Sequence, residues 1–306
     1  TGGIAIWQKI IEDAPRASGF AQTNKFGAFA ILLGFMCIAG LIWARELSHP
    51  RLQRSLLRGL FCIGALAGIF ASFLSGSRGA WLAFAPAVLI SLWATRRLGS
   101  SKNYLLVGLA LGILAVVTAY FLPATGVASR IAGALHELNN YLQGHVTHGS
   151  VGTRLEMWKG AWELFKAKPY IGWGELAYIR EMEHLVEAGV INPEISRYTH
   201  AHNEWFNVLA KKGIAGCLIL LGVYTTPLIW FIHVGHQSTT RGNRNNRRFA
   251  LAIAGGIFSL GFMATGITQV NFDHNIAAIV YVFMIAILIG VLSNNHWPDK
   301  KWHRSD

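Results

Sequence analysis

Seven long apolar segments limit what this chain can fold into more than any other feature of its sequence. They lie at about 27–44, 58–75, 79–95, 103–122, 214–234, 249–270 and 275–293. Because a transmembrane helix needs roughly 20 mainly apolar residues, each segment is long enough to cross a bilayer. Hydrophobic residues make up 53% of the chain and charged residues only 14%, which excludes an ordinary soluble domain. We therefore predict an all-α, polytopic membrane protein with seven transmembrane helices.

The formal net charge of +12 is concentrated in short connections between the apolar segments. Arg and Lys cluster within residues 45–58, 96–102 and 241–248, with a smaller excess after residue 294. These positions fall on alternate connections, which is the pattern of cytoplasmic loops under the positive-inside rule. The charge therefore indicates topology, with membrane lipids as neighbours, and we expect no nucleic-acid partner.

The same rule places four other segments on the opposite side of the membrane: residues 1–26, 75–79, 123–213 and 271–274. An amino terminus on that side requires earlier spans, because the chain shows neither an initiator Met nor a signal-peptide pattern. We therefore expect this chain to be the carboxyl-terminal part of a longer membrane protein.

The long connection over residues 123–213 contains helical signals. Thr153 followed by Glu156 has the spacing of a capping box, which predicts a helix start there. Apolar residues then recur at helical spacing at Leu155, Trp158, Trp162 and Phe165. Two further helical segments are expected, over about 175–188 with Gly189 as a cap, and from an Asn203 cap to about Gly213.

Two arginines are candidate phosphate ligands, and the first of them, Arg78, lies where the positive-inside rule predicts no cation. Arg78 occupies a tight turn between two spans, residues 74–81, and arginine can bind phosphate in a bidentate manner. The alternative is an arginine that snorkels at the interface. Arg154 follows Thr153 at the predicted first turn of a helix, where the helix dipole favours an anion. Its alternative is a salt bridge to Glu156 or to another carboxylate of the 123–213 connection.

A third candidate anion ligand precedes the first span. Arg16 lies there together with Asn24 and Lys25, within residues 15–27. This signal is weaker than the other two, because polar residues are common beside membrane spans.

His202 is the candidate general base, because an imidazole near its ordinary pKa can accept a proton at neutral pH. His200 and His202 could instead be two metal ligands, but no third ligand follows at an informative spacing, and we expect no metal. A structural role for His202 is the remaining alternative. Asp273 and His274 lie in a short turn on the same side of the membrane, where they either orient His202 or the acceptor or cap a span.

These residues resemble a known family. His202-Asn203, followed after nine residues by Gly213-x-x-Gly216, is similar to the signature of lipopolysaccharide O-antigen ligases. Their superfamily also contains O-antigen polymerases and bacterial protein O-oligosaccharyltransferases. Three further elements resemble recurrent features of this superfamily: the Ser-Gly-Ser-Arg-Gly-Ala-Trp turn at 75–81, Arg154-x-x-x-Trp158, and Arg16-x-Ser-Gly-Phe with Asn24.

The resemblance implies an inverting, metal-independent membrane glycosyltransferase of the GT-C-like type, without a cofactor, in the bacterial inner membrane. Its donor would be an undecaprenyl-diphosphate-linked polysaccharide and its acceptor a sugar hydroxyl of the lipid A core. His202 matches the essential histidine, and Arg78 and Arg154 match arginines that hold the diphosphate, with Arg16 as a third. We expect a supporting set of His200, Asn203, Asp273, His274 and Lys25.

Under this reading the chain divides into five parts. A periplasmic segment (1–26) precedes four transmembrane helices (27–122). A periplasmic helical loop that carries the active site (123–213) follows. Three further transmembrane helices (214–293) and a cytoplasmic tail (294–306) complete the chain.

Three alternative functions remain at this point. A polymerase would use a second donor chain as acceptor, and a protein oligosaccharyltransferase would use a protein hydroxyl. A lipid-linked-sugar transporter would carry ionisable residues near the bilayer midplane. The seven apolar segments contain almost no charge at their centres, which favours surface chemistry over transport.

Overall fold

The computed structural model describes residues 2–19, 22–44, 50–98, 102–144, 149–239 and 245–294. These residues form helices and no β-strand, which confirms the predicted all-α class. In chain order the helices are α1 (Gly2–Ile10), α2 (Thr23–Trp43), α3 (Arg51–Ser75), η1 (Arg78–Ala83), α4 (Phe84–Leu98), α5 (Lys102–Phe121), η3 (Pro123–Thr125), α6 (Val127–Leu142), α7 (Ser150–Ala167), α8 (Gly174–Glu187), η4 (Pro193–Arg197), α9 (Glu204–Gln237), α10 (Asn246–Thr265) and α11 (Asn275–Ser293).

Five of the described helices are long and apolar enough to cross a membrane: α2, α3, α9, α10 and α11. These helices indicate a multi-pass membrane protein. The predicted span 79–95 is a shorter apolar helix over Arg78–Ala94, and α5 covers the predicted span 103–122. The count of seven spans therefore stays a prediction. Arg45, Arg241, Arg244 and the tail after Asn294 lie outside the described residues.

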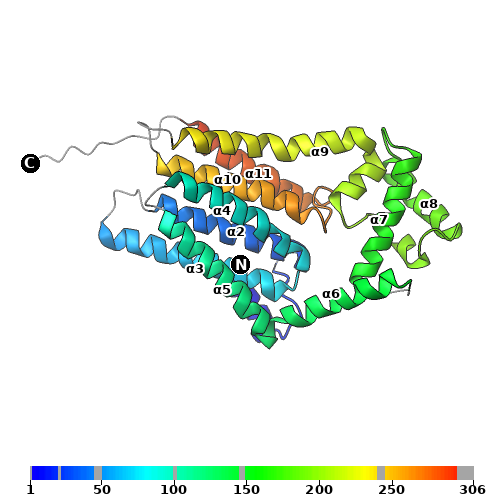
Figure 1. Cartoon of the computed structure of the whole chain (residues 1–306), viewed down its shortest axis with the longest axis horizontal. Coiled ribbons are helices and arrows are strands. Elements are labelled where there is room, and N and C mark those ends of the chain that lie inside the picture. The colour runs from blue at the N-terminus through cyan, green and yellow to red at the C-terminus, as the bar shows by residue number, and fades with distance from the viewer. Residues whose placement is uncertain are drawn as a thin grey trace, which may run out of the picture.

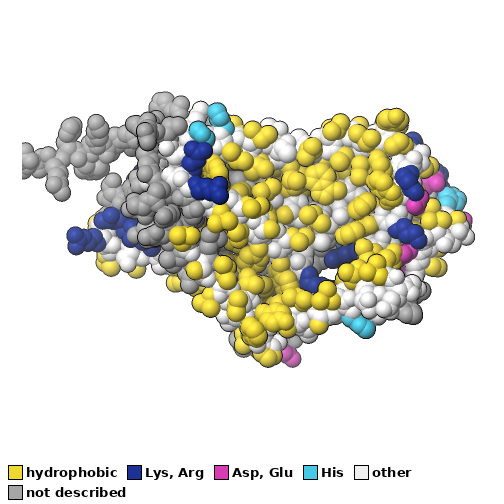
Figure 2. Space-filling model, in the orientation of Figure 1, with side chains coloured by type: hydrophobic (Ala, Val, Ile, Leu, Met, Phe, Trp, Pro, Cys, Tyr) yellow, Lys and Arg dark blue, Asp and Glu magenta, His cyan; other side chains and the backbone are white. Residues whose placement is uncertain are grey.

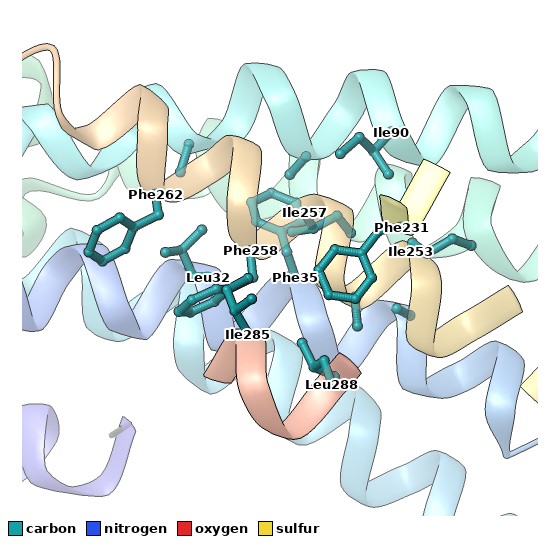
Figure 3. Close-up of a cluster of buried hydrophobic side chains, with 14 of the residues drawn as sticks. Leu32, Phe35, Ile90, Phe231, Ile253, Ile257, Phe258, Phe262, Ile285 and Leu288 are labelled. Atoms are coloured by element: carbon teal, nitrogen blue, oxygen red, sulfur yellow. The ribbon is translucent and has the colours of Figure 1, made fainter. Parts of the chain in front are cut away.

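The membrane bundle is built around α2 and α10. Helix α2 packs most extensively against α3 and α10, and α10 in turn contacts α9 and α4. Large side chains fill the space between these helices, as Figure 3 shows for Leu32, Phe35, Phe231, Phe258 and Phe262, all of them buried. Close packing of this kind holds the ends of the helices in fixed relative positions, and those ends carry the polar residues.

The outer surface of the bundle is apolar, unlike the surface of a soluble protein. Figure 2 shows hydrophobic side chains covering most of the visible face of the bundle. Leu60 and Ile63 on α3 are 63% and 65% exposed, and Ile279 on α11 is 65% exposed. An apolar patch of this extent is typical of a surface that contacts lipid or another protein.

The connections predicted to lie on one side of the membrane gather at one end of the molecule. In Figure 1, α6, α7 and α8 lie beyond that end of the bundle, with α7 running across the direction of the bundle helices. The start of α3 and the end of α4, which carry Arg51, Arg54, Arg96 and Arg97, lie at the opposite end. Helices α6, α7 and α8 therefore form a separate layer at one end of the bundle.

A break in α9 joins this layer to the bundle. Gly213 has φ 63° and ψ −162°, so the helix changes direction there. The N–H groups of Ile214 and Ala215 donate to the carbonyls of Pro169 and Tyr170, at 2.8 and 3.2 Å, instead of to their own helix. A side chain at position 213 would collide with the backbone of Tyr170, so only glycine fits this crossing. The link between α7 and α8 is thereby anchored at the break.

The predicted capping box at Thr153 is wrong. Helix α7 starts one turn earlier, at Ser150, with Gly149 as its N-cap. The Thr153 hydroxyl donates to the Gly149 carbonyl at 2.9 Å. Glu156 instead accepts hydrogen bonds from the Tyr141 hydroxyl and the Asn192 N–H, at 2.7 and 3.0 Å. Its carboxylate therefore joins α6 and the segment after α8 to α7, and this tertiary role replaces the local cap.

Candidate active site

Four arginines from four separate segments lie at the junction between the bundle and the α6–α8 layer. Arg16 precedes α2, Arg78 begins η1 in the turn after α3, Arg130 belongs to α6 and Arg154 to α7. We refer to them as the arginine cluster. The structure thus brings together the three predicted candidates and adds Arg130.

Backbone carbonyls and small polar groups hold the cluster in place. Arg16 Nε donates to the Ser75 carbonyl at 2.8 Å, and its Nη2 donates to Asn24 Oδ1 at 3.0 Å. Arg78 Nη1 donates to the Arg130 carbonyl at 2.9 Å, and its Nη2 donates to Ser150 Oγ at 2.5 Å. These neutral partners orient the guanidinium groups without neutralising them.

The turn after α3 accommodates Arg130 because it contains glycine. Gly76 has φ 62°, and a Cβ there would lie 2.5 Å from Arg130 Cζ. Arg130 Nη1 reaches the Gly76 carbonyl at 3.4 Å, and its Nε is buried without a hydrogen-bond partner among the described residues. The absent side chain at position 76 therefore lets Arg130 approach Arg16 and Arg78.

The electrostatics show that these arginines influence one another. Burial, followed by the charges of Arg130 and Arg78, holds the pKa of Arg16 below its usual value. Burial and the charges of Arg78 and Arg16 also lower the pKa of Arg154, against a smaller opposing effect of Glu137. No ion pair between the described residues joins the cluster to a carboxylate. Like charges gathered in this way are unfavourable unless an anion binds among them.

Space for such an anion is visible at this junction. Figure 2 shows a hollow between the bundle and the α6–α7 layer, with Lys or Arg side chains at its edge. Apolar side chains of the bundle continue up to the hollow. A charged headgroup attached to an apolar tail would meet both surfaces there.

The loop before α9 places His202 beside Arg154. Trp158, one turn after Arg154 on the same face of α7, donates from Nε1 to the Ala201 carbonyl at 3.0 Å. His202 has φ 49°, a left-handed conformation that is uncommon outside glycine and often marks functional sites. Asn203 then caps α9, as predicted, by accepting hydrogen bonds from the N–H groups of Trp205 and Phe206. The helix start thus fixes the histidine against α7.

Three imidazoles form a row that leads away from Arg154. The ring centroids of His202 and His200 are 4.2 Å apart, and those of His200 and His274 are 5.8 Å apart. Burial, His200, Arg154 and His274 lower the pKa of His202 from 6.5 to about 4. Its Nδ1 is buried and has no hydrogen-bond partner within the described part of the chain. His202 is therefore neutral at pH 7 and able to accept a proton.

The residues at the far end of this row have other neighbours. Burial and Lys25 lower the pKa of His274, which places Lys25 on this side of the site. Asp273 accepts hydrogen bonds at Oδ2 from Asn207 Nδ2 at 2.8 Å and from Lys211 Nζ at 3.2 Å. The alternative that these side chains cap a span is wrong. His274 is the N-cap residue of α11, but its side chain makes no capping hydrogen bond, and the Asp273 carboxylate binds Asn207 and Lys211 instead.

A buried carboxylate holds the 271–274 turn against the start of α9. The Glu204 carboxylate accepts hydrogen bonds from the N–H groups of Asn271 and Phe272, and the Glu204 N–H donates to the Gly266 carbonyl at 2.7 Å. This contact positions Asp273 and His274 near His200. It also explains why α10 ends at Thr265, short of the predicted residue 270.

Three polar residues of the site escaped the sequence-based prediction. Arg130 is one of nine Lys and Arg residues in the 123–213 connection, where nine Glu residues balance them, so its charge alone does not single it out. Lys211 and Glu204 lie inside the stretch from His202 to Gly213, where their partners are distant in sequence. All three residues need tertiary structure to be recognised.

Comparisons with known proteins show the family of the chain. A family model described as O-antigen ligase matches residues 63–221, slightly more than half of the chain. A protein of Haemophilus influenzae, described only as uncharacterized, is 25% identical over 234 residues, which are 76% of this chain and 57% of that relative. The chain thus spans less than two thirds of the length of this relative. The matched segment contains Arg78, Arg130, Arg154 and His202, and it shows that the chain belongs to the O-antigen ligase family.

Proposed function

We propose that this protein is an inverting membrane glycosyltransferase that ligates an undecaprenyl-diphosphate-linked O-antigen polysaccharide to the lipid A core. One observation carries the proposal: the arginine cluster adjoins His202, through Arg154 and the Trp158 contact with the histidine loop. Cations for a departing diphosphate and a base for an incoming hydroxyl are the two groups that this transfer needs.

The arginines have the chemistry of a diphosphate site. In the transfer, the acceptor oxygen bonds to C1 of the donor sugar as the bond from C1 to the phosphate oxygen breaks. The diphosphate leaves with the electron pair, and its growing negative charge is stabilised by Arg16, Arg78, Arg130 and Arg154. Fixed guanidinium groups stabilise such charge without a metal or cofactor. The polyprenyl tail would lie along the apolar bundle surface that borders the hollow.

His202 supplies the base. Its neutral imidazole takes the proton of the acceptor hydroxyl as the new bond forms, a contribution of about 10²–10⁴-fold in rate. The charge of Arg154 that now lowers the His202 pKa would be offset by a bound diphosphate, so the histidine becomes a stronger base when the donor is present. Donor binding and base strength are thereby linked.

We further propose that the protein lies in the bacterial inner membrane with the α6–α8 layer in the periplasm. Residues 123–213 would be the periplasmic loop, residues 27–122 and 214–293 the membrane part, and the basic end the cytoplasmic side. Lipid-linked donor and lipid A core would then meet at the outer surface of that membrane.

The test is transfer by the membrane-embedded protein, supplied with lipid-linked polysaccharide and lipid A core. We expect His202→Ala to reduce transfer by about 10²–10⁴-fold at normal protein levels. Arg78→Gln, Arg130→Gln and Arg154→Gln should each reduce donor use by about 10-fold or more. Arg180→Gln, an exposed arginine of α8 that pairs with Glu181, is the matched control and should leave transfer unchanged.

Normal transfer by His202→Ala would contradict the base, and normal donor use by the arginine variants would contradict the diphosphate site. Transfer only to a pilin-like protein would identify an oligosaccharyltransferase, and transfer only to a second donor chain a polymerase. Loss of donor export, with no transfer to any acceptor, would identify a transporter.

A further inference from the structure

A second concave site lies at the other end of the histidine row from Arg154. It is a cavity of about 470 Å³ between the start of α8, the histidine loop, α9 and the 271–274 turn. Its lining includes Glu175, Thr199, His200, Lys211, Phe272 and Asp273, and Lys212 and His274 line the cavity as well. None of the four arginines lines it.

The charge of this cavity is organised around one buried cation. Lys211 is only 3% exposed, and its Nζ contacts Glu175 Oε2 at 2.5 Å and Asp273 Oδ2 at 3.2 Å. The same ammonium group lies 5.0 Å from the centre of the Tyr178 ring. A buried lysine that contacts two carboxylates holds both side chains in one orientation.

These carboxylates retain capacity for a ligand. The partners of Asp273 among the described residues bind through Oδ2, and Lys211 binds Glu175 through Oε2. The Glu175 side chain is 58% exposed at the cavity. An ionised carboxylate has about four acceptor sites, so each can accept further hydrogen bonds from hydroxyl groups.

The two sites differ in the chemistry that they can bind. The arginine cluster suits an anion. The cavity instead has two carboxylates and two lysine ammonium groups in its lining, together with a threonine and an aromatic ring, and this balanced polar lining suits a neutral, polyhydroxylated ligand. The His202 ring adjoins the His200 ring, and His200 lines the cavity. A hydroxyl group presented from the cavity toward His202 is therefore near the proposed base.

We propose that this cavity binds the sugar of the acceptor, with Glu175 and Asp273 accepting hydrogen bonds from its hydroxyl groups. The proposal rests on the proposed transferase function and deepens it, because it separates donor and acceptor on either side of the His200–His202 pair. Lys211 is a positioning residue in this arrangement: it orients the carboxylates and does not touch the reacting atoms.

The experiment is steady-state transfer with the membrane-embedded protein, varying lipid-linked polysaccharide and lipid A core separately. Glu175→Gln keeps the shape of the side chain and an oxygen for Lys211, but it removes the charge. We expect it to raise the KM for lipid A core by about 10-fold and to leave the KM for the donor within about 2-fold. Asp273→Asn should have the same selective effect.

Glu183→Gln is the matched control, because Glu183 is an exposed carboxylate on the same helix and does not line the cavity. It should change neither KM. An unchanged acceptor KM in both Glu175→Gln and Asp273→Asn, or a rise in donor KM instead, overturns the acceptor site while leaving the transferase intact. Absence of transfer by the unmodified protein with any acceptor overturns the proposed function itself, so the two failures are distinct.

Discussion

At the scale of single residues, the pH dependence of transfer should report the environment of His202. Its pKa of about 4 lies below the ordinary 6.5, because burial, His200, Arg154 and His274 disfavour the charged ring. The base must be neutral to accept a proton, so kcat/KM for the donor should stay level from about pH 8 to about 5.5 and fall only near pH 4. A histidine with an ordinary pKa would lose half of its activity at pH 6.5.

Arg154→Gln provides the internal check on this pH profile. Because Arg154 is one of the groups that lower the His202 pKa, the acid limb should move upward, toward 6.5. The measurement is the ratio of kcat/KM at pH 5 and pH 7.5 for both proteins. An acid limb at pH 6.5 in the unmodified protein, or one that the substitution does not move, contradicts the assignment of His202.

The residues of the arginine cluster differ in how far sequence could predict them. Arg78 stood out as a cation where membrane topology predicts none, and Arg154 stood out because it was expected at the start of a helix. The structure brings the two together. The predicted position of Arg154 in the first turn of a helix was wrong, because Arg154 lies in the second turn of α7. Arg130 was missed because α6 went unrecognised and because its neighbour Gly76 lies 54 positions away.

At the scale of elements, the break in α9 should be essential for docking the α6–α8 layer. Gly213→Ala forces a side chain into a left-handed conformation and against the Tyr170 backbone. We expect a loss of stability of about 1–3 kcal/mol or more, with loss of transfer. Thermal unfolding of the membrane-embedded protein measures the loss of stability and the transfer assay measures the loss of activity, while limited proteolysis reports whether the α6–α8 layer stays docked. Proteolysis should shift to the segment between α7 and α8, which loses its anchor.

Gly222→Ala is the control for that substitution, because Gly222 lies in the same helix with open space around it. Alanine there should leave unfolding unchanged or slightly raise the midpoint, since alanine favours helix over glycine. Equal behaviour of the two variants would show that the break at Gly213 is not required for docking.

The elements themselves were more predictable than their packing. Asn203 was correctly identified as a cap, and the expected run 175–188 with Gly189 after it corresponds to α8. The apolar spacing on α7 correctly predicted a helix, but it did not show which side chains are most buried: Met157, Ala161 and Leu164 are buried, whereas Trp162 is 44% exposed. Aromatic residues weigh heavily in a periodic pattern, but small residues such as Gly160 allow the Met182 side chain to approach. Packing of this kind depends on the partner helix, which a local pattern does not contain.

At the scale of the whole molecule, the charge pattern of the sequence and the structure both distinguish a basic end from an end that carries the candidate active site. The described basic residues at the start of α3 and the end of α4 lie at one end, and the α6–α8 layer with the arginine cluster and the histidines lies at the other. Sequence alone could separate these ends, because the positive-inside rule acts on short connections and needs no tertiary structure. It could not predict that the connections at the second end close into a site, since that depends on the Glu156, Glu204 and Gly213 contacts.

This polarity leads to a direct prediction of sidedness. In a protein whose native cysteines, Cys37, Cys62 and Cys217, are replaced, Glu183→Cys places a thiol on exposed α8, and Gln53→Cys places one at the basic end of α3. A membrane-impermeant maleimide added to intact spheroplasts should label Glu183→Cys. It should label Gln53→Cys only after the inner membrane is opened, because the basic loops are retained in the cytoplasm. The reverse pattern would put the arginine cluster and His202 on the cytoplasmic side. Ligation at the periplasmic surface would then fail, even if the roles of the arginines and of His202 were correctly assigned.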